Sequence, residues 1–325
     1  IRPEIAAMQR TAKALAALDC LTGLSRAALK DRYVRPQITN SREGRISIHD
    51  GRHPMVEHAL KREMFVPNDT ELNHTDQEMI IITGPNMAGK STYMRQVAVL
   101  TIMAQTGSFI PAKSASFAPV DRIFTRVGAA DDISTGQSTF MVEMKEVSHI
   151  LCNATKNSLI LLDEIGRGTS TYDGMSIARA VVEYLNSKVH AYTLFATHYH
   201  ELSDMAAENE HIKNYTVTVK ERGKEITFLR RIVPGSADKS YGIHVARLAG
   251  LPESLLKRAD EILEGLEVEG IKEEPAAPVI RRETALNLFS SPIIDELADL
   301  DVMSKTPIEA MEILFRLSKE AKEGH

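Results

Sequence analysis

The 325-residue sequence is poor in cysteine, has no basic excess and contains no long apolar run. Cys20 and Cys152 are too few for a disulfide framework or a zinc site, so we expect two buried thiols in a reducing cytosol. With a net charge of −5, any contact with nucleic acid needs a local basic patch or parts absent from this sequence. Without a transmembrane-length run or a signal-peptide pattern, a soluble cytoplasmic protein is expected. A first residue Ile1, rather than Met, indicates a fragment or a processed chain.

The chain is predicted to form one large domain with appendages, because 43% of its residues are hydrophobic. Residues 1–36 carry helical signals and predict a helical arm. Residues 37–238 alternate short apolar runs with amphipathic stretches, which is typical of an α/β domain with a mostly parallel sheet. Leucines at helical spacing predict a helical unit at 239–268. A linker at 269–284 and a helical tail at 285–325 follow.

Three wholly apolar runs predict buried parallel strands, namely residues 79–83, 159–162 and 192–197. Each run is followed at once by glycine or polar residues, namely Gly84, Asp163 with Glu164, and His198. In an open α/β sheet the ligand lies beyond the carboxyl ends of the strands. The sequence therefore predicts one site that all three strands help to build.

The clearest motif is the phosphate-binding pattern G-x-x-x-x-G-K-[ST]. It comprises Gly84, Pro85, Asn86, Met87, Ala88, Gly89, Lys90 and Ser91, and the predicted ATP site extends to Thr92. Glycines let backbone N–H groups face phosphate oxygens, Lys90 reaches the β- and γ-phosphates, and the Ser91 hydroxyl can bind Mg²⁺. The motif lies between a predicted strand and a predicted helix, which favours this function over a chance Gly-Lys turn.

Two further strand ends carry candidate catalytic residues. Asp163 is predicted to complete the Mg²⁺ shell, and Glu164 to polarise the attacking water as general base. In isolation the two would be ordinary surface acids, but their pairing with the phosphate loop favours function. His198 is predicted to sense the γ-phosphate and orient the water, although a lone histidine is more often structural.

The segment 136–144 opens an amphipathic helix, at whose start Ser138 and Thr139 form a candidate anion site. Simple helix capping is the alternative. The segment lies where ATP-binding-cassette ATPases have a signature helix, and the loop 166–174 is rich in glycine and hydroxyl residues, as a loop at a dimer interface would be. These features predict a composite dimer. Ser134, in a run that imitates the transporter signature L-S-G-G-Q, is the other candidate for the contact between subunits.

Several long motifs resemble the MutS family of DNA mismatch-repair ATPases in order and spacing, namely residues 83–96, 124–132, 138–144, 163–174 and 195–198. The resemblance covers roughly residues 1–268, from the end of the MutS core through the ATPase. It implies a P-loop domain of the ATP-binding-cassette type in a cytoplasmic protein that associates with the nucleoid.

The family resemblance implies a homodimer with two ATP sites at the subunit interface. Ser138 of one subunit would approach the γ-phosphate held by Lys90 of the other. Phe65 and Val66 would pack on the adenine, Asn86 would lie near the γ-phosphate, and residues 239–266 would clasp the partner. ATP hydrolysis would drive mismatch-dependent clamp formation and recruitment of MutL, and missing N-terminal domains would contact mismatched DNA.

The sequence departs from the family pattern in three places. Ala88 replaces the usual second glycine of the phosphate loop, a change we expect to be tolerated. No Phe is followed two residues later by Glu, so this chain lacks the mismatch-reading wedge. The segment Ala285–Phe289 resembles a peptide that binds the replication sliding clamp, but with Ala285 in place of Gln. An apolar linker anchor is the alternative there, and the tail after it fits either oligomerisation or simple packing.

The sequence argues against three rival functions. A transporter motor subunit would carry a proper L-S-G-G-Q and a docking subdomain, but here the signature is imperfect and the helical arm is unlike that subdomain. A chromosome-condensing clamp would carry long coiled-coil heptads next to the ATPase, and the sequence has none. A binding-only switch would lack a catalytic acid, and Glu164 and His198 argue against it.

Overall fold

The computed structural model describes residues 4–40, 44–60, 64–85, 88–128, 138–222, 225–236 and 241–270. It divides into two units, Ile1–Asp260 and Glu261–His325. Several predicted features lie outside the described residues, namely Asn86, Met87, Ser134, residues 271–284 of the linker and the tail with Ala285–Phe289.

A six-stranded sheet carries the three strands predicted from apolar runs. Its order is β10 (Glu225–Pro234), β9 (Ile212–Arg222), β4 (Met79–Thr83), β8 (Tyr192–Ala196), β7 (Leu159–Asp163) and β6 (Ile123–Arg126). All neighbours pair in parallel except β10 and β9, which are antiparallel. Because β4, β8 and β7 are parallel neighbours, their carboxyl ends lie at one edge, as predicted.

A second, four-stranded sheet was not expected from the sequence. Its order is β1 (Gln37–Ile38), β5 (Ser114–Phe117), β2 (Arg45–Gly51) and β3 (Asn68–Asn73). Only the β1–β5 pair is parallel. The α/β class is thus confirmed, but with two mixed sheets in place of a single one.

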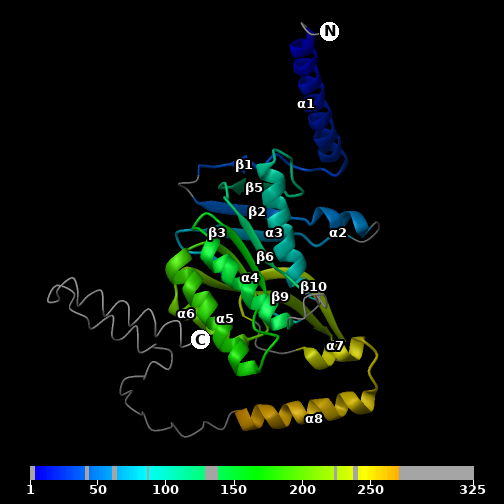
Figure 1. The fold of residues 1–325 in the computed structure, drawn as a ribbon. Coiled ribbons are helices and arrows are strands. Elements are labelled where there is room, and N and C mark those ends of the chain that lie inside the picture. The colour runs from blue at the N-terminus through cyan, green and yellow to red at the C-terminus, as the bar shows by residue number, and fades with distance from the viewer. Residues whose placement is uncertain are drawn as a thin grey trace, which may run out of the picture. The chain divides into compact units, whose positions relative to one another are not determined.

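Helices connect and cover the strands (Figure 1). They are α1 (Ile5–Lys30), α2 (Pro54–Ala59), α3 (Lys90–Gln105), α4 (Thr139–Asn153), α5 (Thr171–Tyr184), η3 (Leu185–Val189), η4 (His200–Asp204), α6 (Met205–Glu208), α7 (Gly242–Leu248) and α8 (Glu253–Gly270). The predicted helix after Ser138 is therefore present as α4. Helix α8 continues past residue 268, where the linker was predicted to begin, to Gly270.

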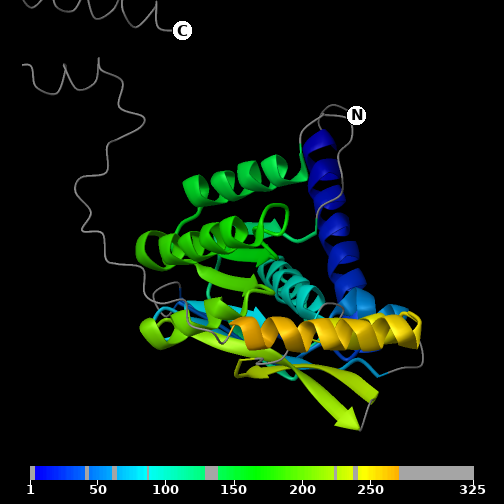
Figure 2. The same cartoon turned by 90° about the horizontal axis from the view of Figure 1, so that it is seen from below.

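The core has two halves, one on each face of the six-stranded sheet. Side chains alternate along a strand, so Ile80 and Ile82 of β4 pack in one cluster with α3 and the second sheet. Ile81 packs in the other cluster, with α4 and α5. These two helices lie side by side on that face (Figure 2). The central strands are therefore covered on both faces and hold the site edge rigidly.

Replacing Ile81 by alanine tests this core. The side chain is fully buried, so we expect the free energy of unfolding to fall by about 2–5 kcal/mol in urea titrations. Ile102→Ala on the half-exposed surface of α3 is the matched control and should change stability far less. An equal loss in both variants would contradict the assignment of β4 to the core.

Helix α1 extends away from the sheets (Figure 1) and buries only Ala28. Its large exposed apolar side chains are Ile5, Met8, Leu15, Leu18, Leu21 and Leu29. Cys20 on this helix and Cys152 on α4 are both exposed, so the prediction of buried thiols is wrong. The reason is local: α1 has almost no packed face, and α4 buries the stripe Glu143, Val147 and Ile150, which excludes Cys152.

Candidate functional site

The loop after β4 has the backbone of an anion-binding site. Gly84 has φ 129° and Gly89 has φ 104°, in the left-handed region that favours glycine. Helix α3 begins directly after Gly89, and no side chain caps its first turn. Its N–H groups and the positive end of its dipole therefore face the loop, where they favour a phosphate.

Lys90, the first residue of α3, is buried within this loop. Its Nζ donates to the carbonyl oxygen of Gly84 and, at 3.4 Å, to that of Pro85. Burial lowers the pKa of Lys90, and the carboxylates of Glu164 and Asp163 act in the opposite direction. A cation thus lies among the loop carbonyls beside two acids, in position to meet a phosphate.

Ser91 and Asp163 meet at the same edge. The Ser91 hydroxyl donates to Asp163 Oδ2 at 2.5 Å. Burial raises the pKa of Asp163, while the hydrogen bond from Ser91 lowers it. Within the described residues no three His, Cys, Asp or Glu side chains converge on a metal position. One carboxylate and one hydroxyl nevertheless suit Mg²⁺, which keeps several waters and also uses phosphate oxygens as ligands.

Glu164 has an unusual backbone. Its φ is 54°, although it is not glycine, and its N–H donates to the carbonyl of Ala196 at 2.9 Å. Its largely buried carboxylate pairs with the exposed Arg167. A left-handed non-glycine residue held by its surroundings is a kind of strain that gathers at functional sites. This geometry supports a chemical role for Glu164.

His198 lies just beyond β8, next to the site edge. Its ring packs against the Tyr199 ring, with centroids 4.1 Å apart and the ring planes tilted by 38°. Partial burial lowers the pKa of His198, and the Glu164 carboxylate opposes this shift. The ring is therefore neutral near pH 7 and has one nitrogen that donates and one that accepts.

An open cavity of about 290 Å³ lies beside these acids. It is lined by Arg126, Gly128, Thr139, Glu143, Asp163, Glu164, Arg167 and Gly168. Thr139, predicted for the signature segment, is thus brought to the same cavity as Glu164. Ser138 is exposed and caps α4, since its Oγ accepts from the N–H of Met141 at 3.2 Å. Ser138 therefore caps the helix, as the alternative interpretation holds. Because capping uses only a lone pair of Oγ, the Ser138 hydroxyl can still donate a hydrogen bond to another group.

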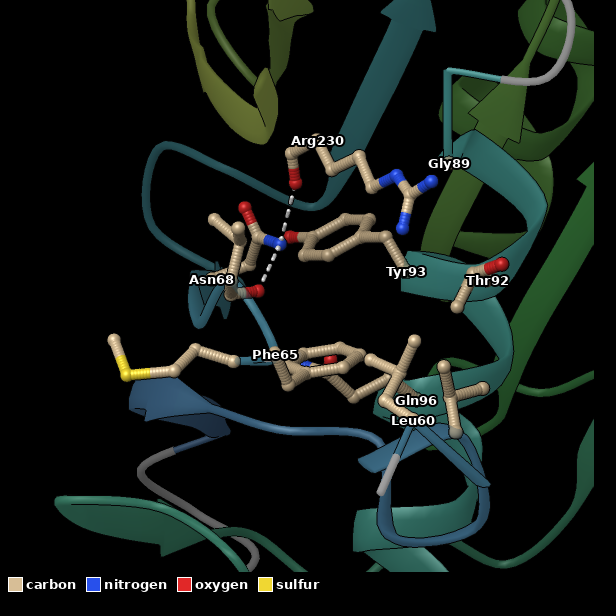
Figure 3. Close-up of a pocket in the computed structure, with 11 residues that line it drawn as sticks. Leu60, Phe65, Asn68, Gly89, Thr92, Tyr93, Gln96 and Arg230 are labelled. Carbon is tan, nitrogen blue, oxygen red and sulfur yellow. Dashed lines mark hydrogen bonds between the residues drawn. The ribbon is translucent and has the colours of Figure 1, made fainter. Parts of the chain in front are cut away.

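A second cavity, of about 270 Å³, adjoins the phosphate loop at Gly89 (Figure 3). Its walls are Val56, Leu60, Met64, Phe65, Val66, Asn68, Gly89, Thr92, Tyr93, Gln96 and Arg230. Phe65 and Val66, predicted to contact a base, therefore share one pocket with Gly89 and Thr92. In Figure 3 the Tyr93 ring is drawn between the Arg230 side chain and the Phe65 ring. Phe65 lines the cavity with an aromatic side chain, on which a flat ring can stack.

Several pocket residues were missed by the sequence analysis. Tyr93 and Gln96 continue the face of α3 that starts at Gly89 and Thr92, so helical spacing would have found them. Arg230 gave no such signal. It lies at a bulge of β10, and Asn68 fixes it by donating to its carbonyl at 3.1 Å.

The family model for MutS domain V matches residues 80–267, which include the carboxyl ends of β4, β7 and β8. The chain belongs to the MutS family. It is 51% identical over 99% of its length to the DNA mismatch repair protein MutS of Acetivibrio thermocellus. Over 98% of its length it is 54% identical to that of Caldicellulosiruptor bescii and 52% to that of Methanococcoides burtonii. It spans 38% of the length of each relative.

These relatives are all named as DNA mismatch repair proteins. Among the described residues, no helix is both long and apolar enough to cross a bilayer.

Proposed function

We propose that this chain binds ATP with Mg²⁺ and hydrolyses it, as a P-loop domain of the ATP-binding-cassette type. The observation that carries the proposal is the order of features along one edge. An apolar cavity with Phe65 is followed by the phosphate loop with Lys90, and then by the acidic cavity with Glu164. When ATP is hydrolysed, the base, the triphosphate and the water that attacks the γ-phosphate lie in this same order.

Each residue has a definite role in this proposal. Lys90 and the loop N–H groups hold the phosphates, while Ser91 and Asp163 hold Mg²⁺, which neutralises phosphate charge when bound. Glu164 polarises the water as general base. The neutral His198 orients that water beside the γ-phosphate.

A second copy would complete the site. Ser138 is exposed at the N-terminus of α4 and has a hydroxyl hydrogen to donate, so it can contact a phosphate bound to a partner. Residues 239–266 would clasp that partner. The relatives are named for DNA mismatch repair. We therefore infer that ATP turnover in the whole protein drives mismatch-dependent clamp formation and MutL recruitment, with mismatched DNA bound by N-terminal domains. A sliding-clamp contact through Ala285–Phe289 belongs to the same proposal.

Phosphate release by the purified chain tests the activity directly. We expect ATP to be cleaved in the presence of Mg²⁺ and the rate to fall to background with EDTA. Calorimetry with ATP in EDTA separates nucleotide binding from turnover. Failure of both binding and release would overturn the proposal, and binding without release would favour a nucleotide-dependent switch.

Removing the Phe65 ring tests the base pocket. Stacking on an aromatic side chain contributes about 1–3 kcal/mol per base, so Phe65→Ala should raise the Kd for ATP about tenfold in calorimetry. Phe109→Ala is the matched control, because Phe109 is also partly exposed but does not line this cavity. If both variants bind ATP like the parent, the base lies elsewhere.

A further inference from the structure

Gly166, in the loop after β7, is held from two sides by buried side chains. Its N–H donates to Glu143 Oε1 of α4 at 2.6 Å. Its carbonyl accepts from the Tyr199 hydroxyl at 3.2 Å. Glu143 is 6% exposed and Tyr199 is 4% exposed, so water does not replace either contact. We call these three residues the α4 clamp.

Close packing leaves the clamped loop little freedom. Gly166 has φ 88°, and a Cβ there would lie 2.4 Å from the carbonyl oxygen of Gly174 on α5. A Cβ on Gly168 would lie 3.1 Å from Phe140 Cβ in the first turn of α4. The loop therefore fits between α4 and α5, and a shift of α4 must shift the loop too.

The α4 clamp joins the two candidate catalytic groups to the candidate partner contact. Glu164 precedes Gly166 in the same loop, and the His198 ring packs against the Tyr199 ring. At the other end, Glu143 belongs to the helix that Ser138 caps. A buried carboxylate needs charged or hydrogen-bonding partners, and Arg126 lies 3.5 Å from the second oxygen of Glu143.

We propose that Glu143 is a positioning residue, which through Gly166 sets Glu164 and His198 relative to α4. In this role Glu143 acts through its hydrogen bond to Gly166 and not by contact with nucleotide. Resting on the proposed ATPase function, the inference goes further: contact of a second copy with the N-terminus of α4 is conveyed to the general base through the α4 clamp. A purely structural Glu143 would serve only as the buried partner of Arg126.

Two substitutions separate these roles. Glu143→Gln keeps an oxygen that accepts from Gly166 but removes the charge opposite Arg126. Glu143→Leu removes both. Small misplacements of catalytic groups cost about 100-fold in rate, so Glu143→Leu should lower kcat by about that factor while KM for ATP stays within about twofold. Glu143→Gln should restore most of kcat.

Glu146→Gln is the matched control. Glu146 also pairs with Arg126, at 2.9 Å, but makes no contact with Gly166. We expect parent kinetics from this variant. If kcat falls as far in Glu146→Gln and Glu143→Gln as in Glu143→Leu, the ion pairs of Arg126 determine the rate and the positioning role is wrong.

Hydrogen exchange at the Gly166 amide measures the α4 clamp without nucleotide. The amide should exchange slowly in the parent and in Glu143→Gln, and quickly in Glu143→Leu. If exchange quickens while kcat is unchanged, the positioning role is overturned and the ATPase proposal stands. A parent that releases no phosphate overturns the ATPase proposal itself, and the positioning role with it.

Tyr199→Phe provides a second test of the α4 clamp in case Glu143→Leu misfolds. It removes the donor to the Gly166 carbonyl but keeps the ring that packs against His198. We expect a smaller fall in kcat with unchanged KM. Parent turnover in Tyr199→Phe, together with a Glu143→Leu variant that melts early by circular dichroism, would reduce Glu143 to a folding role.

Discussion

Glu164→Gln should slow phosphate release by about 100-fold or more, because a general base contributes at least that factor. ATP binding should persist, since the phosphate loop, Lys90 and the Ser91–Asp163 pair are unchanged. Because phosphate release stops while ATP binding is retained, the variant should accumulate in the ATP-bound state. Phosphate assays give the rate and calorimetry gives the affinity.

The trapped variant also reports on the composite site. Sedimentation of Glu164→Gln should show a dimer with ATP and Mg²⁺, and less of it without nucleotide. Glu183→Gln is a suitable control, because Glu183 is a surface acid that pairs with Arg179. If Glu164→Gln hydrolyses ATP as fast as the parent, Glu164 is not the general base. If the ATP-bound chain stays monomeric, the proposal of a site shared between two copies is wrong.

Mixing two inactive variants gives the second large effect. Lys90→Ala and Ser138→Ala should each lose turnover, the first through the phosphate loop and the second through the partner. In a mixed dimer one site has both intact residues and the other has neither. Equal amounts that exchange freely should therefore recover about a quarter of the parent rate, since half of the dimers are mixed and each has one complete site.

A second mixture controls for this recovery. Lys90 and Glu164 would serve the same site from the same copy, so Lys90→Ala mixed with Glu164→Gln should recover nothing. Full turnover by Ser138→Ala alone, or equal recovery in both mixtures, would show that Ser138 does not act across the interface.

The sequence predicted the parts of the site that follow one another along the chain. Strands β4, β7 and β8 are apolar on both faces, so their runs were visible, and the polar residues after each run were assigned with them. Helix α4 was visible from its amphipathic spacing. The family resemblance supplied Phe65 and Val66, which contribute to one pocket with the phosphate loop.

The rest depends on contacts between distant residues. The second sheet uses short strands with polar residues on one face, which gave no long apolar run. Arg230 reaches the base pocket only through a bulge that Asn68 holds from 162 positions away. The contact of Glu143 with Gly166 joins a side chain to a backbone N–H, and such a contact leaves no periodic pattern.

The bare surface of α1 bears on how association of this chain is to be measured. A helix that exposes this many apolar side chains to water can associate with other copies whether or not nucleotide is present. Absolute mass in solution is thus a poor guide to the shared site. The increase in mass on adding ATP, at constant protein concentration, is the quantity that reports the shared site.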